Sequence, residues 1–188
     1  MNLRYIFFIL LCLSNGCREV FVPKPRAFLS LEYPKATYQK INSNMPFSFE
    51  KNKLATLEII KNNYETKSFN LKYNLLNANL YLSYQQINNN LSSYISEIQF
   101  RTKTHEKVAN EVFEQKFENF ETSVFGNLYK LTGPVASQSQ FYITDKKNHF
   151  VSGSLYFETK PNYDSILPAV IYIQKDITHF IESLRWKN

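Results

Sequence analysis

The sequence contains only two cysteines among its 188 residues, and both lie within the first 17. If Cys12 leaves with a signal segment and Cys17 is modified, as argued below, the mature chain has no thiol, which excludes a disulfide framework and a cysteine-based metal site. With only four glycines, the chain has no glycine-rich phosphate-binding loop. The three histidines, at positions 105, 149 and 179, have no metal-ligand spacing, and we interpret them as structural.

Long hydrophobic runs are also missing. Residues 6–13 form an apolar run of eight, whereas a membrane-spanning helix needs about 20 apolar residues. A run of this length after a basic residue, here Arg4, is typical of a secretory signal segment. We therefore expect the start of the chain to direct secretion and not to span the bilayer.

The end of this run indicates the type of signal. Gly16 is followed by Cys17, with Leu13 and Ser14 upstream, and this order resembles a bacterial lipoprotein signal in which Cys17 becomes the acylated first residue. Asn15 departs from the usual pattern. Simple secretion and an uncleaved anchor are the alternatives. Cys12 is the competing acylation site, but the large residue before it disfavours cleavage there.

These observations divide the chain into three parts. Residues 1–16 are the expected signal peptide, residues 17–25 an acylated cysteine with a short proline-containing tether, and residues 26–188 a single domain. Loss of Arg4 with the signal lowers the formal charge from +6 to +5. Basic and acidic residues are interspersed, so nucleic-acid binding, which needs a continuous basic surface, is not expected.

Residue periodicity predicts an order of strands, helix, strands, helix. A helical period is expected over residues 91–110 and again over 165–186, with Ser165 as the N-cap, Pro168 in the first turn and Asp176 away from the apolar stripe. Alternation predicts strands at residues 27–33, 46–50, 68–73, 78–85, 111–119, 124–131, 139–145 and 150–159.

Short connections between these strands favour an antiparallel sheet. We predict an α+β fold with an antiparallel β-sheet of about six to eight strands and two main α-helices packed on it. The alternation indicates that most strands bury one face against the helices.

Catalytic motifs are weak. The sequence around Gly153 and Ser154 does not satisfy G-x-S-x-G, because Tyr156 stands where the second glycine is required. A small hydrolase built from Ser154, His149 and Asp164 is one alternative function. A module that binds peptidoglycan or lipid is another, and it would need a pocket between the sheet and the helices.

Two loops contain more small and polar residues than a simple connection needs. They are residues 132–141 and 160–168, where a hairpin connection and a helix cap are the plain interpretations. The functional interpretation is a partner-binding rim, because binding residues gather on loops held by a rigid sheet. The candidate residues are Gly133, Pro134, Ser137, Gln140, Asn162, Tyr163 and Asp164. Asp164 and Ser165 also match a short O-glycosylation pattern, although the expected cap accounts for Ser165 without it.

The same loops belong to a longer series of motifs. In order along residues 24–187 they are "KPRAFLSLEYPK", "PFSFE", "LYLSY", "ASQSQFYITD", "GSLYF" and "PNYDSILPAVIYIQKDITHFIESLRWK". Together they resemble the gliding-motility lipoprotein GldD family of Bacteroidota. Residues 51–66 and 103–123 do not match closely, so no role is assigned there.

The resemblance implies a role in gliding motility and in the type IX secretion machinery. It also implies an outer-membrane lipoprotein that faces the periplasm. Its expected partners are other lipoproteins of this apparatus, with GldJ the first expected. No enzymatic activity, catalytic residue or cofactor is implied. The order of strands and helices is similar to the Mog1/PsbP sandwich, which is an analogy at the level of the fold.

Overall fold

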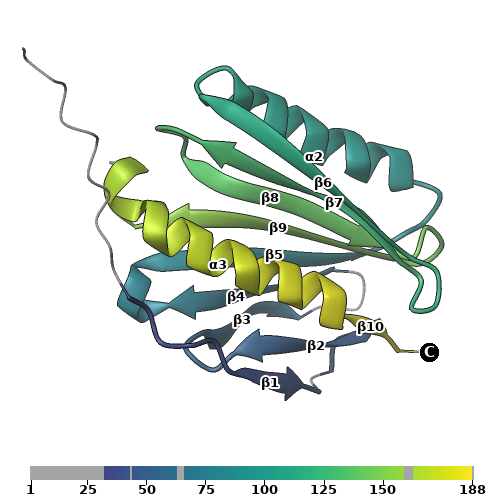
Figure 1. Ribbon diagram of the computed structural model, residues 1–188. Helices are drawn as coiled ribbons and strands as arrows, with labels where there is room; N and C mark the ends of the chain where they lie inside the picture. The colour runs from purple at the N-terminus through teal and green to yellow at the C-terminus, as the bar shows by residue number, and fades with distance from the viewer. Residues whose placement is uncertain (1–31, 43, 63–65, 159–162, 188) are drawn as a thin grey trace, which may run out of the picture.

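The computed structural model describes residues 32–42, 44–62, 66–158 and 163–187. These ranges hold ten strands, one 3-10 turn and two long helices (Figure 1). In chain order they are β1 (Tyr38–Ile41), β2 (Phe47–Asn52), β3 (Thr56–Asn62), β4 (Thr66–Tyr73), η1 (Asn74–Leu76), β5 (Ala78–Gln86), α2 (Leu91–Glu106), β6 (Glu111–Asn119), β7 (Val124–Thr132), β8 (Ser137–Thr144), β9 (His149–Phe157), α3 (Tyr163–Ser183) and β10 (Arg185–Trp186).

The strands form two sheets. The larger has seven strands in the order β3-β4-β5-β9-β8-β7-β6, and every neighbouring pair is antiparallel. The smaller has the order β1-β2-β10, and both of its pairings are also antiparallel. The expected α+β fold, with helices on an antiparallel sheet, is therefore confirmed.

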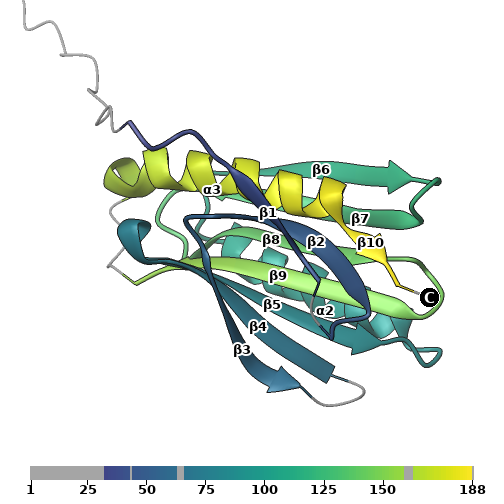
Figure 2. The ribbon, with the colours of Figure 1, turned by 90° about the horizontal axis from the view of Figure 1, so that it is seen from below.

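The two helices cover opposite faces of the large sheet. Helix α3 and the small sheet lie on one face, and α2 lies on the other (Figures 1 and 2). The larger core cluster joins Ile173, Ile177 and Phe180 of α3 to Phe141 and other side chains of the sheet. The smaller cluster joins Ile98 of α2 to side chains from the other sheet face. Strand β8 runs between these layers, and all eight of its residues are buried.

Most predicted elements are found with small changes in their bounds. Strands β2 and β4 to β9 correspond to expected strands, and the apolar stripe expected on α3 is buried. Helix α2 ends at Glu106, four residues before the expected end, and Val108 is 57% exposed instead of part of the core. The strand expected at residues 27–33 lies mostly outside the described residues, and Glu32 and Tyr33 are not in a strand.

Helix α3 is displaced from its expected bounds at both ends. It begins at Tyr163, so Ser165 lies inside it and is not its N-cap, and Pro168 falls in the second turn instead of the first. It ends at Ser183. Arg185 and Trp186 leave the helix and pair with β2, where the Trp186 ring packs edge-on against Phe47 at 5.9 Å between centroids. This pairing with a second sheet is the reason the helix stops early.

Close packing of β7 on β8 leads to a prediction about Gly126. A Cβ atom added to Gly126 would lie 1.9 Å from the backbone carbonyl oxygen of Tyr142, and a backbone atom inside a sheet cannot move aside as a side chain can. We expect Gly126→Ala to lower the free energy of unfolding by about 3 kcal/mol, the upper end of overpacking costs.

Urea unfolding measures this loss, and Ser152→Ala on β9 is the control. Ser152 is half-buried, and its substitution removes one atom without adding any, so the control should stay within about 0.5 kcal/mol of wild type. An equal, small effect of both substitutions would contradict the described packing of β7 on β8.

Candidate functional site

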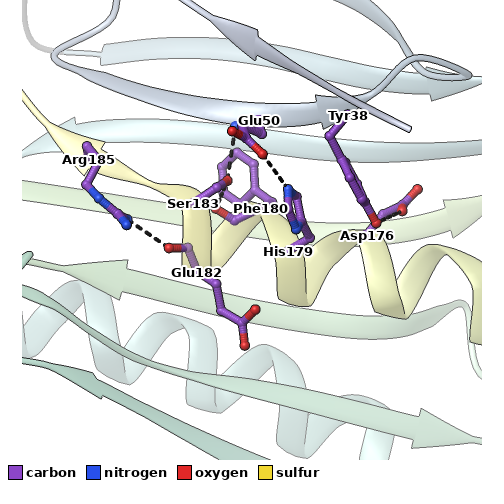
Figure 3. A network of polar contacts seen from close by, with 8 residues as sticks. All are labelled: Tyr38, Glu50, Asp176, His179, Phe180, Glu182, Ser183 and Arg185. Carbon is purple, nitrogen blue, oxygen red and sulfur yellow. Dashed lines mark hydrogen bonds and ion pairs between the residues drawn. The ribbon is translucent and has the colours of Figure 1, made fainter. Parts of the chain in front are cut away.

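The strongest polar cluster of the described residues lies between α3 and the small sheet (Figure 3). We call it the Asp176 network, and it consists of Tyr38, Asn52, Tyr73, Tyr172 and Asp176. The carboxylate of Asp176, a residue only 4% exposed, accepts hydrogen bonds from the Tyr38 hydroxyl at 2.8 Å and from the Asn52 amide at 2.8 Å. The Tyr73 hydroxyl bonds the same carboxylate.

The network extends to the chain that precedes β1. Asn52 also donates to the Tyr172 hydroxyl at 2.9 Å, and that hydroxyl donates to the backbone carbonyl of Pro34 at 3.0 Å. The Tyr33 ring packs against the Tyr172 ring at 5.3 Å between centroids. These contacts hold the segment that enters the fold against helix α3.

A second group of contacts continues along the same face of α3 (Figure 3). His179 Nε2 lies 2.7 Å from Glu50 Oε2, and the His179 ring stacks on Tyr38 with centroids 3.6 Å apart. The backbone N–H of Glu50 donates to Ser183 Oγ at 3.0 Å. Helix α3 is thus attached to β1 and β2 by polar contacts over three of its turns.

Burial controls the ionisation of this network. It raises the pKa of Asp176, while the hydrogen bonds from Asn52, Tyr38 and Tyr73 and the nearby His179 oppose that rise. Burial and the Asp176 carboxylate raise the pKa of Tyr38 and of Tyr73, so both hydroxyls stay protonated and donate. Because each strong polar group is used internally, we interpret the Asp176 network as a structural device and not as a reaction centre.

Sequence reasoning missed this network. Asp176 was expected on the solvent side of α3, which is wrong, because it is buried against β2. A signal was available: Asp176 lies three residues after Ile173 and four before Phe180, at the spacing of the buried stripe.

The described parts of the two expected loops, which are the connection between β7 and β8 and the first residues of α3, lie at the same end of the molecule (Figure 1). Burial raises the pKa of Tyr163, and the negative charges of Asp164 and Glu111 add to that rise. Glu111 pairs with Thr132, which lies beside the first loop. Gly133 has a positive φ of 96°, which favours glycine, and Pro134 after it is exposed. Asn162 lies outside the described residues.

Three of the expected rim residues, Gly133, Ser137 and Gln140, are not on the surface. Ser137 and Gln140 are 0% and 1% exposed, because β8 is covered by α2 on one face and α3 on the other. The Ser137 hydroxyl donates to the backbone carbonyl of Ser139, and Thr102 of α2 donates to Gln140. The prediction that the side chains of Ser137 and Gln140 contact a partner directly is therefore wrong. The surface that we call the rim below consists of Pro134, Tyr163 and Asp164.

The catalytic triad considered for the hydrolase alternative is not formed. Ser154 and His149 lie five residues apart on β9, which is about 16 Å of strand, and odd spacing places their side chains on opposite faces. Asp164 is at the start of α3, exposed to solvent. No proton could pass between these three groups, so they do not form a catalytic triad.

The histidines have structural surroundings. His149 begins β9 instead of lying in a turn; its ring stacks on Trp186 at 5.1 Å, and its Nδ1 lies 3.0 Å from the Tyr84 hydroxyl. Burial lowers the pKa of His105. In the ranges that the structure describes, no three His, Cys, Asp or Glu side chains gather closely enough to hold a metal ion.

Two of the hollows on the surface include residues considered above. One, of about 580 Å³, lies beside His149 and Trp186, and charges of both signs line it, among them Asp145, Lys147 and Arg185. The other, of about 410 Å³, lies on the large sheet beside α2 and includes Ser154. Between α3 and the sheet the core is filled by buried apolar side chains, so on that side of the sheet the described residues leave no ligand pocket of the kind that the lipid or peptidoglycan alternative required.

Comparison with models of known protein families gives a match over most of the chain. The family model described as gliding motility lipoprotein GldD matches residues 18–186. No curated protein matches the chain. Among the described elements, no helix is both long enough and apolar enough to pass through a bilayer.

Proposed function

The chain belongs to the gliding motility lipoprotein GldD family, and from this premise we propose that it is a non-catalytic lipoprotein of the outer membrane. Family membership implies a role in gliding motility and attachment to a membrane. We further propose that Cys17 carries the acyl chains, that the folded part faces the periplasm, and that it supports assembly or stability of the type IX secretion machinery.

The family match over residues 18–186 is the observation that carries this proposal. Two features of the fold agree with it. The residues named for a hydrolase lie apart, and the Asp176 network uses its polar groups internally. The segment that leads into β1 is hydrogen-bonded to α3, because the Tyr172 hydroxyl donates to the Pro34 carbonyl. A folded part held in this way is suited to contacts with other proteins near a membrane.

The proposed contact surface is the rim, and GldJ is the proposed partner. Pro134 and Asp164 are exposed, and Tyr163 beside Asp164 is half-buried. Loops held by a rigid sheet are common binding surfaces, because the scaffold fixes their conformation without ordering cost.

Site-specific photocrosslinking tests this proposal. A photoreactive residue at Asp164 or at Pro134, in cells of the native host, should crosslink to GldJ. Lys103 on α2 is the matched control, because it is equally exposed and lies on the opposite side of the sheet. The partner proposal would fail if GldJ were absent from the rim crosslinks, or if the Lys103 variant captured it equally well.

A further inference from the structure

The hollow on the α2 side of the large sheet has an unusual floor. Helix α2 packs on β7, β8 and β9, and the hollow of about 410 Å³ extends from β9 across β5 and β4 toward the edge strand β3. An exposed sheet face usually carries long charged side chains. Here the floor is made of short hydroxyl and amide side chains, and for that reason it is recessed.

The floor residues form two rows across the strands. The registers of β4, β5 and β9 align Ser68, Ser83 and Ser152 in one row. They align Asn70, Tyr81 and Ser154 in the next row. All six line the hollow, so hydroxyl and amide groups are spaced at regular strand separations over one surface.

Ser154 is the most buried of the four serines in this floor. The residue is only 9% exposed, and within the described part of the chain its hydroxyl has no hydrogen-bond partner. Its neighbour across the ladder on β8 is Gln140, whose Nε2 atom is buried and equally without a partner among the described residues. Ser154 lines the hollow, so its hydroxyl is available to an occupant, and Gln140 Nε2 is the buried donor beside it that lacks the hydrogen bond buried polar groups nearly always make.

The walls add an aromatic surface and a single charge. Tyr81 is 46% exposed and is held edge-on by Tyr156, with ring centroids 5.6 Å apart. Arg101 reaches the hollow from α2. Arg101 pairs with Glu97, and both side chains are about half exposed, so this pair contributes little and a ligand carboxylate can replace Glu97.

The lining distinguishes between classes of ligand. An extended peptide cannot add to this surface, because β5 and β9 are each paired on both sides and their backbone groups are used. An acyl chain would need a mainly apolar lining, and among the described lining residues only Ile60 and Leu82 are aliphatic. A polyphosphate would need several cations, and of the lining residues that the structure describes only Arg101 is charged.

We propose that this hollow binds a short saccharide that carries a carboxylate. The serine hydroxyls and the Asn70 amide would exchange hydrogen bonds with sugar hydroxyls, the exposed Tyr81 ring would pack against the apolar face of a sugar ring, and Arg101 would pair with the carboxylate. This proposal does not depend on the partner proposed for the rim.

Isothermal titration and saturation-transfer NMR on the full-length protein in detergent test it. The probes are a disaccharide of glucuronic acid and N-acetylglucosamine and, as a neutral counterpart, N,N′-diacetylchitobiose. We expect the acidic disaccharide to bind about tenfold more tightly, the scale of one hydrogen bond to a charged group. Arg101→Ala should remove this preference and leave the neutral disaccharide unaffected.

Two substitutions in the floor and one control locate the site. Ser83→Trp should fill the hollow and abolish binding, and Ser154→Ala, which cannot disturb the fold by adding atoms, should weaken it severalfold. Ser93→Trp on the exposed side of α2 is the control and should bind as wild type does. The proposal would be overturned if neither disaccharide bound, or if the folded Ser83→Trp variant bound as tightly as wild type. A preference for anionic vesicles over both sugars would overturn it as well.

Discussion

Asp176→Ala should lower the free energy of unfolding by about 3 kcal/mol, because it leaves several buried donors without an acceptor. The Tyr38 hydroxyl and the Asn52 amide each lose a hydrogen bond of 2.8 Å, and Tyr73 loses its acceptor as well. Urea unfolding followed by the fluorescence of the single tryptophan, Trp186, measures the change.

Two further variants separate the causes of this loss. Asp176→Asn keeps the shape and one acceptor oxygen, so we expect a smaller loss of about 1–2 kcal/mol. Lys175→Ala changes the neighbouring exposed residue and should stay within about 0.5 kcal/mol of wild type. If Asp176→Ala were as mild as Lys175→Ala, the Asp176 network would not hold α3 to the small sheet.

The pH dependence of the same variants has a definite sign. The pKa of Asp176 is raised in the folded protein, chiefly by burial, so the folded state binds a proton at a higher pH than the unfolded state does. The stabilisation that this proton contributes is fully present when the pH is below the pKa of Asp176 in the unfolded chain. It is lost as the pH rises through the pKa of Asp176 in the folded protein. The stability of wild type relative to Asp176→Asn should therefore increase as pH is lowered from 7 toward 4, and a decrease would contradict the raised pKa.

Cys17→Ser should release the protein from the membrane, and this is the largest effect expected on its location. Serine cannot form the thioether that carries the acyl chains. Each buried CH₂ group contributes about 0.8 kcal/mol to anchoring, so loss of whole chains removes the attachment. Fractionation of cell envelopes, with detection by antibody, measures the distribution between membrane and soluble fractions.

Cys12→Ser is the matched control for this substitution. It removes the only other cysteine of the chain, and it should leave the protein in the membrane fraction. If the Cys17→Ser protein stayed in the membrane fraction as wild type does, the result would favour an uncleaved anchor. Release of Cys12→Ser would assign acylation to the competing site.

The sequence predicted most of the large sheet because its strands alternate. Phe69, Leu71 and Tyr73 of β4 face the core in strict succession, and the same is true of Leu80, Leu82 and Tyr84 of β5. Strands β1, β3 and β10 were missed for physical reasons. Strands β1 and β10 are short, and the edge strand β3 contains a register shift and exposes Ile59 and Ile60, which disrupts its alternation.

The functional surfaces were harder to predict than the fold. Ser137 and Gln140 were interpreted as rim residues of the loop at 132–141, although Gln140 also fell in the strand expected at 139–145; both lie in β8, covered on both faces. Periodicity within one strand shows only the side chains of that strand, and it cannot reveal that helices from elsewhere in the chain cover both faces. Asp176 was misplaced for a related reason, since its partners Tyr38 and Asn52 are more than 120 residues away in sequence.

The most direct test of the account is the gliding of a strain that lacks this gene and carries either the wild-type or the Cys17→Ser allele. Colony spreading and secretion of type IX cargo are both scored. The account predicts that the deletion strain neither spreads nor secretes normally, that the wild-type allele restores both, and that Cys17→Ser restores neither. Normal spreading and secretion in the deletion strain would contradict it.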